Sequence, residues 1–220
     1  MKVDILTLFP EFYDSFLNTS IIKRAIDNKL VKINLINIRD FSTDKHNKVD
    51  FKPYGGGAGM VLRIDFLVSA LESVKKEDSK VILLDPAGKT FDSKDSIKLS
   101  KIKHLIFICG HYEGIDARIY KYVDYIYSLG NFIMTGGEVA SLPIIDSIIR
   151  QIPGVISEDS LLHESFNEEL LDYDNYTIPR DFRGDSVPEV LVNGDHKKIK
   201  EWRQNNRLDK TRRKNTYEGF

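Results

Sequence analysis

The 220-residue chain contains one cysteine and one tryptophan, and it has no long uninterrupted apolar run. A single cysteine, Cys109, excludes an intramolecular disulfide, and its place at the end of an apolar run predicts a buried thiol in a reducing compartment. No cysteines and histidines stand at the spacing of a zinc site. The first residues, MKVDILTLFPEF, are too short and too polar for a signal peptide or a membrane span. We therefore expect a cytoplasmic protein without membrane association.

The order of apolar patterns predicts an α/β fold. Strand-like runs are expected at residues 2–8, 31–38, 81–84, 105–109 and 122–127, and helical patterns at residues 10–16, 21–25, 64–74, 93–101 and 138–151. Strands that alternate with helices favour a mostly parallel sheet covered on both faces. The length adds room for one smaller domain, because domains cluster near roughly 100 to 200 residues.

Charge is distributed unevenly in the last third of the chain. Residues 158–174 carry seven acidic residues and no lysine or arginine, whereas residues 197–214 carry nine lysines and arginines against two acids. We predict an α/β domain over 1–157, a mobile acidic linker over 158–170 and a helical domain over 171–220, in which Asp195 caps a helix. The basic run is either a solvated helix face or, with Trp202 inside it, a surface that binds a polyanion.

Two glycine-containing loops do not fit the common phosphate-binding motifs. Gly88 is followed by lysine and threonine, but the earlier glycine of a P-loop would fall at Leu83, inside a strand. The cluster from Gly55 to Gly59 lacks the P-loop lysine and has Met60 where a dinucleotide fingerprint needs glycine. This cluster is either a flexible surface turn or a place where the backbone approaches a flat ligand closely.

Four motifs occur together in one order: PYGGGAGM at 53–60, CGHYEGID at 109–116, TGGE at 135–138 and LDYDNYT at 171–177. In this register they resemble the bacterial tRNA (guanine-37-N1)-methyltransferase family of the SPOUT superfamily, from Met1 to about Arg213. The resemblance implies a SPOUT fold with a deep trefoil knot, a small helical C-terminal domain that binds tRNA, and a homodimer with active sites shared between subunits.

The resemblance also implies that S-adenosylmethionine binds in the knot. The matching positions are Leu84, Asp85, Pro86, Gly110, Tyr112, Leu129, Gly130, Asn131, Phe132, Ile133, Met134, Gly136 and Gly137. An adenine ring needs an apolar slot with backbone donors and acceptors, which an apolar, glycine-interrupted loop can supply. Without the motifs, these apolar residues would be interpreted as ordinary core.

Methyl transfer to guanine N1 requires a base, since that nitrogen carries a proton at neutral pH. Asp172 matches the family's proposed base, and Asp174 is either a neighbouring like charge or a solvated loop acid. Glu113 could accept hydrogen bonds from the guanine edge, or it could be a helix-start acid. The expected substrate-binding residues are Asp50, Tyr54, Gly55, Gly59, Arg180 and Arg183. Magnesium dependence is implied by the family, but the sequence shows no cluster of metal ligands.

The chain departs from the family pattern at several positions. His111 stands where arginine is common, Ala58 where proline is common, and Ile178 where a basic residue usually follows the last motif. No arginine lies between Arg150 and Arg180, so the supporting arginine expected before Asp172 is absent from that segment. Two alternatives stay open: a SPOUT methyltransferase that acts on another RNA site, and a non-catalytic RNA-binding protein that retains the cofactor pocket.

Overall fold

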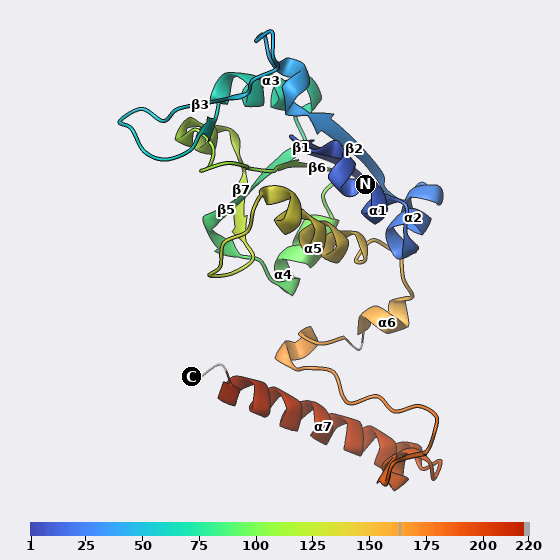
Figure 1. Ribbon diagram of the computed structural model, residues 1–220. Helices are drawn as coiled ribbons and strands as arrows, with labels where there is room; N and C mark the ends of the chain where they lie inside the picture. Colours follow the sequence, from blue (N-terminus) through green and yellow to red (C-terminus); the bar gives the residue numbers. More distant parts are fainter. Residues whose placement is uncertain (163, 218–220) are drawn as a thin grey trace. The chain divides into compact units, whose positions relative to one another are not determined.

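The structure, a computed structural model, describes residues 1–162 and 164–217. It divides the chain into two compact units, Met1–Ile156 and Ser157–Phe220. The first unit contains the larger sheet and its covering helices, and the second contains the long C-terminal helix (Figure 1). In the described ranges, no helix has both the length and the apolar character needed to cross a bilayer.

The first unit is built on a five-stranded sheet with the order β2-β1-β6-β5-β7. Every neighbouring pair in this sheet is parallel, which confirms the predicted α/β fold with a mostly parallel sheet. The strands are β1 (Lys2–Thr7), β2 (Lys32–Asn37), β5 (Lys80–Thr90), β6 (His104–Ile108) and β7 (Tyr125–Ser128).

Helices cover both faces of this sheet (Figure 1). Helices α2 (Ser20–Asp27), α4 (Ser93–Ser100) and α5 (Gly137–Ile149) bury their apolar residues against one face. Helix α3 (Ile64–Val74) and the 3-10 turn η3 (Ala117–Tyr122) pack against the other. Successive strand residues supply the two faces: in β5, Ile82 and Leu84 contact the first group, whereas Val81 and Leu83 contact the second. A strand buried on both faces therefore reads as a continuous apolar run.

Short elements connect the main ones. They are η1 (Pro10–Tyr13), α1 (Asp14–Leu17), η2 (Ile38–Phe41), β3 (Asp50–Phe51) and β4 (Val61–Leu62). The strand expected over 122–127 begins later than predicted, at Tyr125, because Tyr122 still belongs to η3. The side chain of Asp116 accepts a hydrogen bond from the Arg118 backbone N–H and caps that turn. Tyr120 and Tyr122 therefore lie in the turn and not in an extended strand.

The second unit contains α6 (Glu158–Leu162), η4 (Asn167–Glu169), β8 (Asp181–Phe182), β9 (Asp185–Ser186), η5 (Glu189–Leu191) and α7 (His196–Tyr217). The predicted cap is confirmed, since Asp195 Oδ1 accepts a hydrogen bond from the Lys198 backbone N–H at 3.1 Å. The acidic segment over 158–170 contains α6 and η4, and its mobility stays a prediction. Where side chains of this unit are described, none is fully buried.

Candidate functional site

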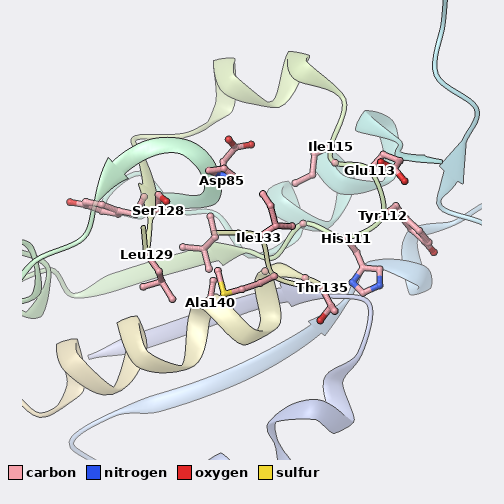
Figure 2. Close-up of a pocket in the computed structure, with 18 of the residues that line it drawn as sticks. Asp85, His111, Tyr112, Glu113, Ile115, Ser128, Leu129, Ile133, Thr135 and Ala140 are labelled. Atoms are coloured by element: carbon pink, nitrogen blue, oxygen red, sulfur yellow. The ribbon is translucent and has the colours of Figure 1, made fainter. Parts of the chain in front are cut away.

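A pocket opens in the first unit beyond the carboxyl ends of β6 and β7 and next to Leu84, Asp85 and Pro86 of β5, near the edge at which parallel α/β sheets bind their ligands. Its volume is about 340 Å³, within the usual range for small-molecule sites. Figure 2 shows Asp85, Ser128 and Leu129 on one side and His111, Tyr112 and Glu113 on the other, with Ile133 between them.

The pocket brings together most of the residues predicted to bind a cofactor. Those that line it are Leu84, Asp85, Pro86, Gly110, Tyr112, Leu129, Phe132, Ile133, Met134, Gly136 and Gly137, whereas Gly130 and Asn131 do not. Their contacts with a cofactor stay predictions. The Gly130 N–H donates to Ser128 Oγ and the Gly130 carbonyl accepts from it, so both groups already have hydrogen-bond partners within the loop.

Seven further lining residues were not predicted as cofactor contacts or catalytic residues. They are His111, Gly114, Ile115, Tyr127, Ser128, Thr135 and Ala140. Most are sequence neighbours of predicted residues, so extending each motif by one or two positions would have found them. Ala140 lies one helical turn after Gly136 and Gly137, which places it on the same side of α5.

Two glycines let the loops after β6 and β7 approach each other closely. The Gly137 N–H donates to the Gly110 carbonyl at 2.7 Å. A Cβ atom on Gly137 would lie 2.7 Å from Cys109 Cα and from Gly110 N, and one on Gly136 would lie 2.7 Å from His111 Nδ1. A side chain at position 137 would push the two loops apart, whereas one at position 136 would displace the side chains of Glu138 and His111, so both glycines shape this wall of the pocket.

A buried carboxylate lies behind this wall. Glu138 is almost inaccessible to solvent, and its Oε1 accepts a hydrogen bond from Thr7 Oγ1 at 2.8 Å. Its Oε2 lies 3.6 Å from His111 Nδ1, a buried nitrogen for which the described residues offer no hydrogen-bond partner. The His111 ring packs against Phe9, with 4.9 Å between ring centroids. His111 therefore faces the carboxylate on one side and forms the pocket lining with its remaining surface.

Tyr112 is held in an unusual backbone conformation next to the pocket. Its φ is 64°, a left-handed value that is uncommon for a non-glycine residue. The Tyr112 hydroxyl accepts a hydrogen bond from Arg39 Nη2 at 3.3 Å, which connects the pocket to η2. Nothing in the sequence pattern indicates Arg39, because the contact joins segments 73 residues apart.

The structure brings Glu113 together with the end of the glycine cluster. The Glu113 N–H donates to the Met60 carbonyl at 3.0 Å, and the Leu62 N–H donates to the Gly114 carbonyl at 2.9 Å. A Cβ on Gly59 would lie 2.5 Å from Glu113 Oε1. Gly59 therefore makes room for this carboxylate, a structural reason for glycine that does not depend on a ligand.

Among the other substrate-binding candidates of the first unit, Asp50 is held near the contact between Glu113 and the glycine cluster. Asp50 pairs with Leu62 across the short β3–β4 ladder, so it is fixed next to the strand that contacts the Glu113 loop. Gly55 has a φ of 84°, and Tyr54 is fully exposed. Their roles in binding stay predictions.

Asp172 lies in the second unit on a segment attached to α7. The Asp172 N–H donates to Ser165 Oγ, and its Oδ1 accepts a hydrogen bond from the Tyr173 N–H at 2.7 Å. One residue earlier, the Leu171 N–H donates to Thr211 Oγ1 at 2.9 Å. The hydrogen bonds of the Leu171 and Asp172 N–H groups anchor the backbone that carries this carboxylate.

Asp174 is paired with two side chains of α7. Its Oδ1 lies 2.9 Å from Lys210 Nζ, and its Oδ2 accepts a hydrogen bond from Asn206 Nδ2 at 2.9 Å. The hydrogen bonds from Lys210 and Asn206 lower the pKa of Asp174 below its ordinary value. Its negative charge is therefore compensated and anchors the segment to α7.

The two arginines predicted to bind substrate lie near the β8–β9 hairpin. Arg180 Nη2 donates to Glu189 Oε1 at 2.6 Å, and the guanidinium of Arg183 lies over the Phe182 ring. Both arginines are exposed. Throughout the described ranges, no three acidic, histidine or cysteine side chains come together as a metal site.

Comparisons with known proteins identify the family to which this sequence is similar. The family profile described as tRNA (guanine-1)-methyltransferase TrmD matches residues 1–218. The chain is 54% identical to the tRNA (guanine-N(1)-)-methyltransferase of Malacoplasma penetrans (strain HF-2), over 96% of this chain and 94% of that protein. It is 53% identical to the enzyme of the same name from Clostridium botulinum (strain Eklund 17B / Type B), over 97% and 90% of the two chains. A third protein of that name, from Carboxydothermus hydrogenoformans, is 51% identical, over 94% of this chain and 83% of its own length.

Proposed function

Because the chain belongs to the tRNA (guanine-1)-methyltransferase family, TrmD, we propose that it methylates N1 of guanine 37 in tRNA, next to the anticodon, with S-adenosylmethionine as donor. The match extends over nearly the whole chain, so both units take part in the comparison. The position of the guanine and the identity of the donor are the parts that need an experiment.

The observation that carries this proposal is the pocket lined by the middle of β5 and by the loops after β6 and β7. Gly136 and Gly137 form one wall of the pocket, the glycine wall, which leaves backbone groups close to a ligand. Leu129, Ile133 and Met134 offer an apolar slot for an adenine ring. Its volume suits a nucleoside-sized molecule. The residues present therefore fit S-adenosylmethionine, which when bound supplies an electrophilic methyl group.

The remaining chemistry belongs to side chains of this chain. Asp172 would remove the proton from guanine N1, since an acceptor within hydrogen-bond reach can act as a general base. Glu113 would accept hydrogen bonds from the donor edge of the base, because a carboxylate is an acceptor with two oxygens. Asp50, Tyr54 and the glycine cluster would contact the base or its neighbours, and Arg180 and Arg183 the phosphates. Positioning of donor and acceptor supplies much of the remaining rate.

We further propose the SPOUT fold with a trefoil knot in the first unit. The tight backbone contact of Gly137 with Cys109 and Gly110 supports it, because the loops that would wall a knot pack together without intervening side chains.

We also propose a homodimer with shared active sites. Several large apolar side chains of the first unit are exposed, among them Tyr54, Phe132 and Ile133. Exposed apolar groups that gather at a binding site are typical of surfaces covered by a partner or a ligand.

In this proposal, the second unit binds tRNA, and residues 158–170 act as a mobile linker. The tRNA substrate places the enzyme in the cytoplasm. No step is assigned to magnesium, since the described residues do not form a metal-ligand cluster.

A methyl-transfer assay tests the proposed function. The chain is incubated with methyl-labelled S-adenosylmethionine and a tRNA transcript with guanine at positions 36 and 37, and the digested RNA is analysed by mass spectrometry. We expect 1-methylguanosine at position 37 and no label in a transcript with adenine there. Label at another nucleotide would instead identify a different SPOUT activity. Cofactor binding with no transfer to any RNA would identify a non-catalytic RNA-binding protein.

A further inference from the structure

A second cavity lies within the second unit, between the segment that follows Asp172 and the first turns of α7. Its volume is about 370 Å³. Three aromatic residues, Tyr173, Tyr176 and Trp202, line it together with the side chains of Arg180 and Arg203. Asp172 is not part of its lining, so the cavity is separate from the proposed base.

The aromatic rings and guanidinium of this cavity already form contacts with one another. Tyr176 and Trp202 meet edge to face, with 6.1 Å between ring centroids and an angle of 62° between planes. The guanidinium carbon of Arg203 lies 4.6 Å from the centroid of the Tyr173 ring. Tyr176 is 49% exposed, so one of its faces is available to a ligand. Flat π-faces next to a guanidinium are the groups on which proteins stack nucleobases.

The cavity wall is fixed before any ligand binds. The Asp174 N–H donates to Asn206 Oδ1 at 2.7 Å, and the Asp174 carboxylate accepts the Asn206 amide and pairs with Lys210. Tyr173 follows Asp172 and precedes this anchor, so α7 holds the segment that carries both tyrosines. A preorganised wall reduces the entropy that is lost when a ligand is ordered.

Charge identifies the class of ligand. Helix α7 carries the whole basic run over 197–214, with nine lysines and arginines against two acids. A polyanion that lies along such a helix would bring its bases to the cavity at the start of the helix. The lining residues Ile178 and Val192 are exposed, so the cavity is open to solvent.

We propose that this cavity binds one unpaired nucleobase of the tRNA substrate, other than the guanine that is methylated. The inference rests on the proposed function, because it takes RNA as the substrate. The cavity would be a second site at which the enzyme recognises single-stranded RNA. Stacking in the cavity requires a base that is not paired within an RNA helix, whereas phosphate contacts also form with paired RNA. A stem-loop with an unpaired base at the right distance would thus bind better than a duplex of equal charge.

The single tryptophan of the chain provides a direct test, since Trp202 lines the cavity. The whole chain, without cofactor, is titrated with anticodon stem-loop RNA that has guanine at positions 36 and 37, and Trp202 fluorescence is recorded. A series of the same RNA with one abasic nucleotide at each loop position other than 37 is titrated in parallel. We expect quenching by the intact RNA, and one abasic variant that binds about tenfold more weakly and does not quench.

Variants separate stacking from charge. Tyr176→Ala should weaken binding of the intact RNA about tenfold and make it insensitive to the critical abasic position. Trp202→Phe retains an aromatic face and should bind RNA nearly as well, as measured by filter binding. Lys200→Gln, on the same helix but outside the cavity lining, should weaken all the RNAs of the series equally.

Equal binding of every abasic RNA, or unchanged Trp202 fluorescence on binding, would overturn the inference. A fluorescence change on protein dilution without RNA, and none on RNA addition, would also overturn it, because a second copy of the chain would then cover the cavity. These outcomes are distinct from failure of the proposed function, which is a lack of methyl transfer to guanine 37. Transfer with no effect of Tyr176→Ala would leave the function standing and refute the base pocket.

Discussion

Asp4, in β1 between β2 and β6, shows how single residues stabilise the first unit. Its side chain is inaccessible to solvent, and its Oδ2 lies 2.8 Å from His104 Nε2, while Asn34 Nδ2 donates to Oδ1 at 2.6 Å. His104 Nδ1 lies 2.7 Å from Ser79 Oγ, which completes the buried chain of polar groups. Burial alone would raise the pKa of Asp4, but hydrogen bonds from Lys2, Asn34 and His104 outweigh it and lower the pKa.

Asp4→Asn should destabilise the protein by about 2–4 kcal/mol, since it removes the charge from a buried network whose other members stay in place. Urea unfolding at neutral pH measures the change in the free energy of unfolding. The control is Asp27→Asn, which removes an exposed i,i+4 pair with Lys23 and should cost no more than about 0.5 kcal/mol. Equal effects of the two substitutions would show that the network is not stabilising.

The pH dependence of stability follows from the same residue. Because the folded pKa of Asp4 is lowered, its contribution is complete above the unfolded value of about 3.9 and is lost as the pH falls through the folded value. Wild-type stability should therefore decrease below about pH 4 more steeply than that of Asp4→Asn. Parallel pH profiles for the two proteins would contradict this assignment.

Cys109 offers a probe of global opening. It is fully buried beneath the glycine wall, and burial, together with the charge of Glu138, raises the pKa of its thiol to about 12. Since the thiolate is the reactive form, alkylation of the native protein at pH 8 should be more than about a hundredfold slower than that of the urea-unfolded chain. The single cysteine makes the mass shift unambiguous. Rapid labelling of the native state would show that the wall opens readily.

At the scale of secondary structure, periodicity located most elements of the first unit. Helix α3 begins and ends at the predicted residues 64 and 74, and β6 lies within one residue of the prediction, because each has a complete apolar pattern and polar flanks. Strand β5 was predicted to end at Leu84 but continues to Thr90 through an irregular pairing with β7. A bulge of this kind depends on the neighbouring strand, which local sequence does not encode.

The candidate site could likewise be predicted only where it depends on local sequence. Motifs indicated the loops that line the pocket, because glycines and apolar residues repeat around them. Long-range contacts were not indicated, such as Thr7 with Glu138, which are 131 residues apart, or Arg39 with Tyr112. The pairing of Asp174 with Lys210 was missed for the same reason.

Replacement of Gly137 should disrupt the close packing between the loops after β6 and β7. Gly137→Ala would place a Cβ 2.7 Å from Cys109 Cα and Gly110 N, both of which are backbone atoms that have little room to move. We expect cofactor affinity to fall more than about a hundredfold, measured by calorimetry with S-adenosylhomocysteine. Gly194→Ala is the control, because its added Cβ meets open space and only its positive φ is strained. Unchanged affinity in Gly137→Ala would refute the glycine wall.

Helix α7 should make RNA binding dependent on salt. Its basic side chains would displace counterions from tRNA phosphates, so the logarithm of the binding constant should fall linearly with the logarithm of salt concentration. Lys200→Gln should reduce the magnitude of the slope by roughly 0.7–0.9, the change expected for one phosphate contact. Lys23→Gln, on α2, should leave the slope unchanged. A slope that is the same in wild type and Lys200→Gln would exclude this lysine from the interface.

At the scale of the whole molecule, the proposed function divides the reaction between the two units. The pocket, its glycine wall and Glu113 belong to Met1–Ile156, whereas Asp172 and the basic helix belong to Ser157–Phe220. Donor binding and proton removal are therefore assigned to different parts of the chain. A substitution in the second unit should change turnover and leave the affinity for the donor intact.

Single-turnover methyl transfer by Asp172→Asn tests this account most directly. The rate of 1-methylguanosine formation at position 37 is measured together with the dissociation constant for S-adenosylmethionine, in wild type, Asp172→Asn and the neighbouring Asp174→Asn. We expect Asp172→Asn to bind the donor with unchanged affinity and to transfer the methyl group on the order of a hundredfold or more slowly, since general-base catalysis contributes roughly 10²–10⁴-fold. Asp174→Asn should have a smaller effect, because its carboxylate anchors the segment to Lys210. An unchanged transfer rate in Asp172→Asn, or a methyl group at any other atom, would contradict the account.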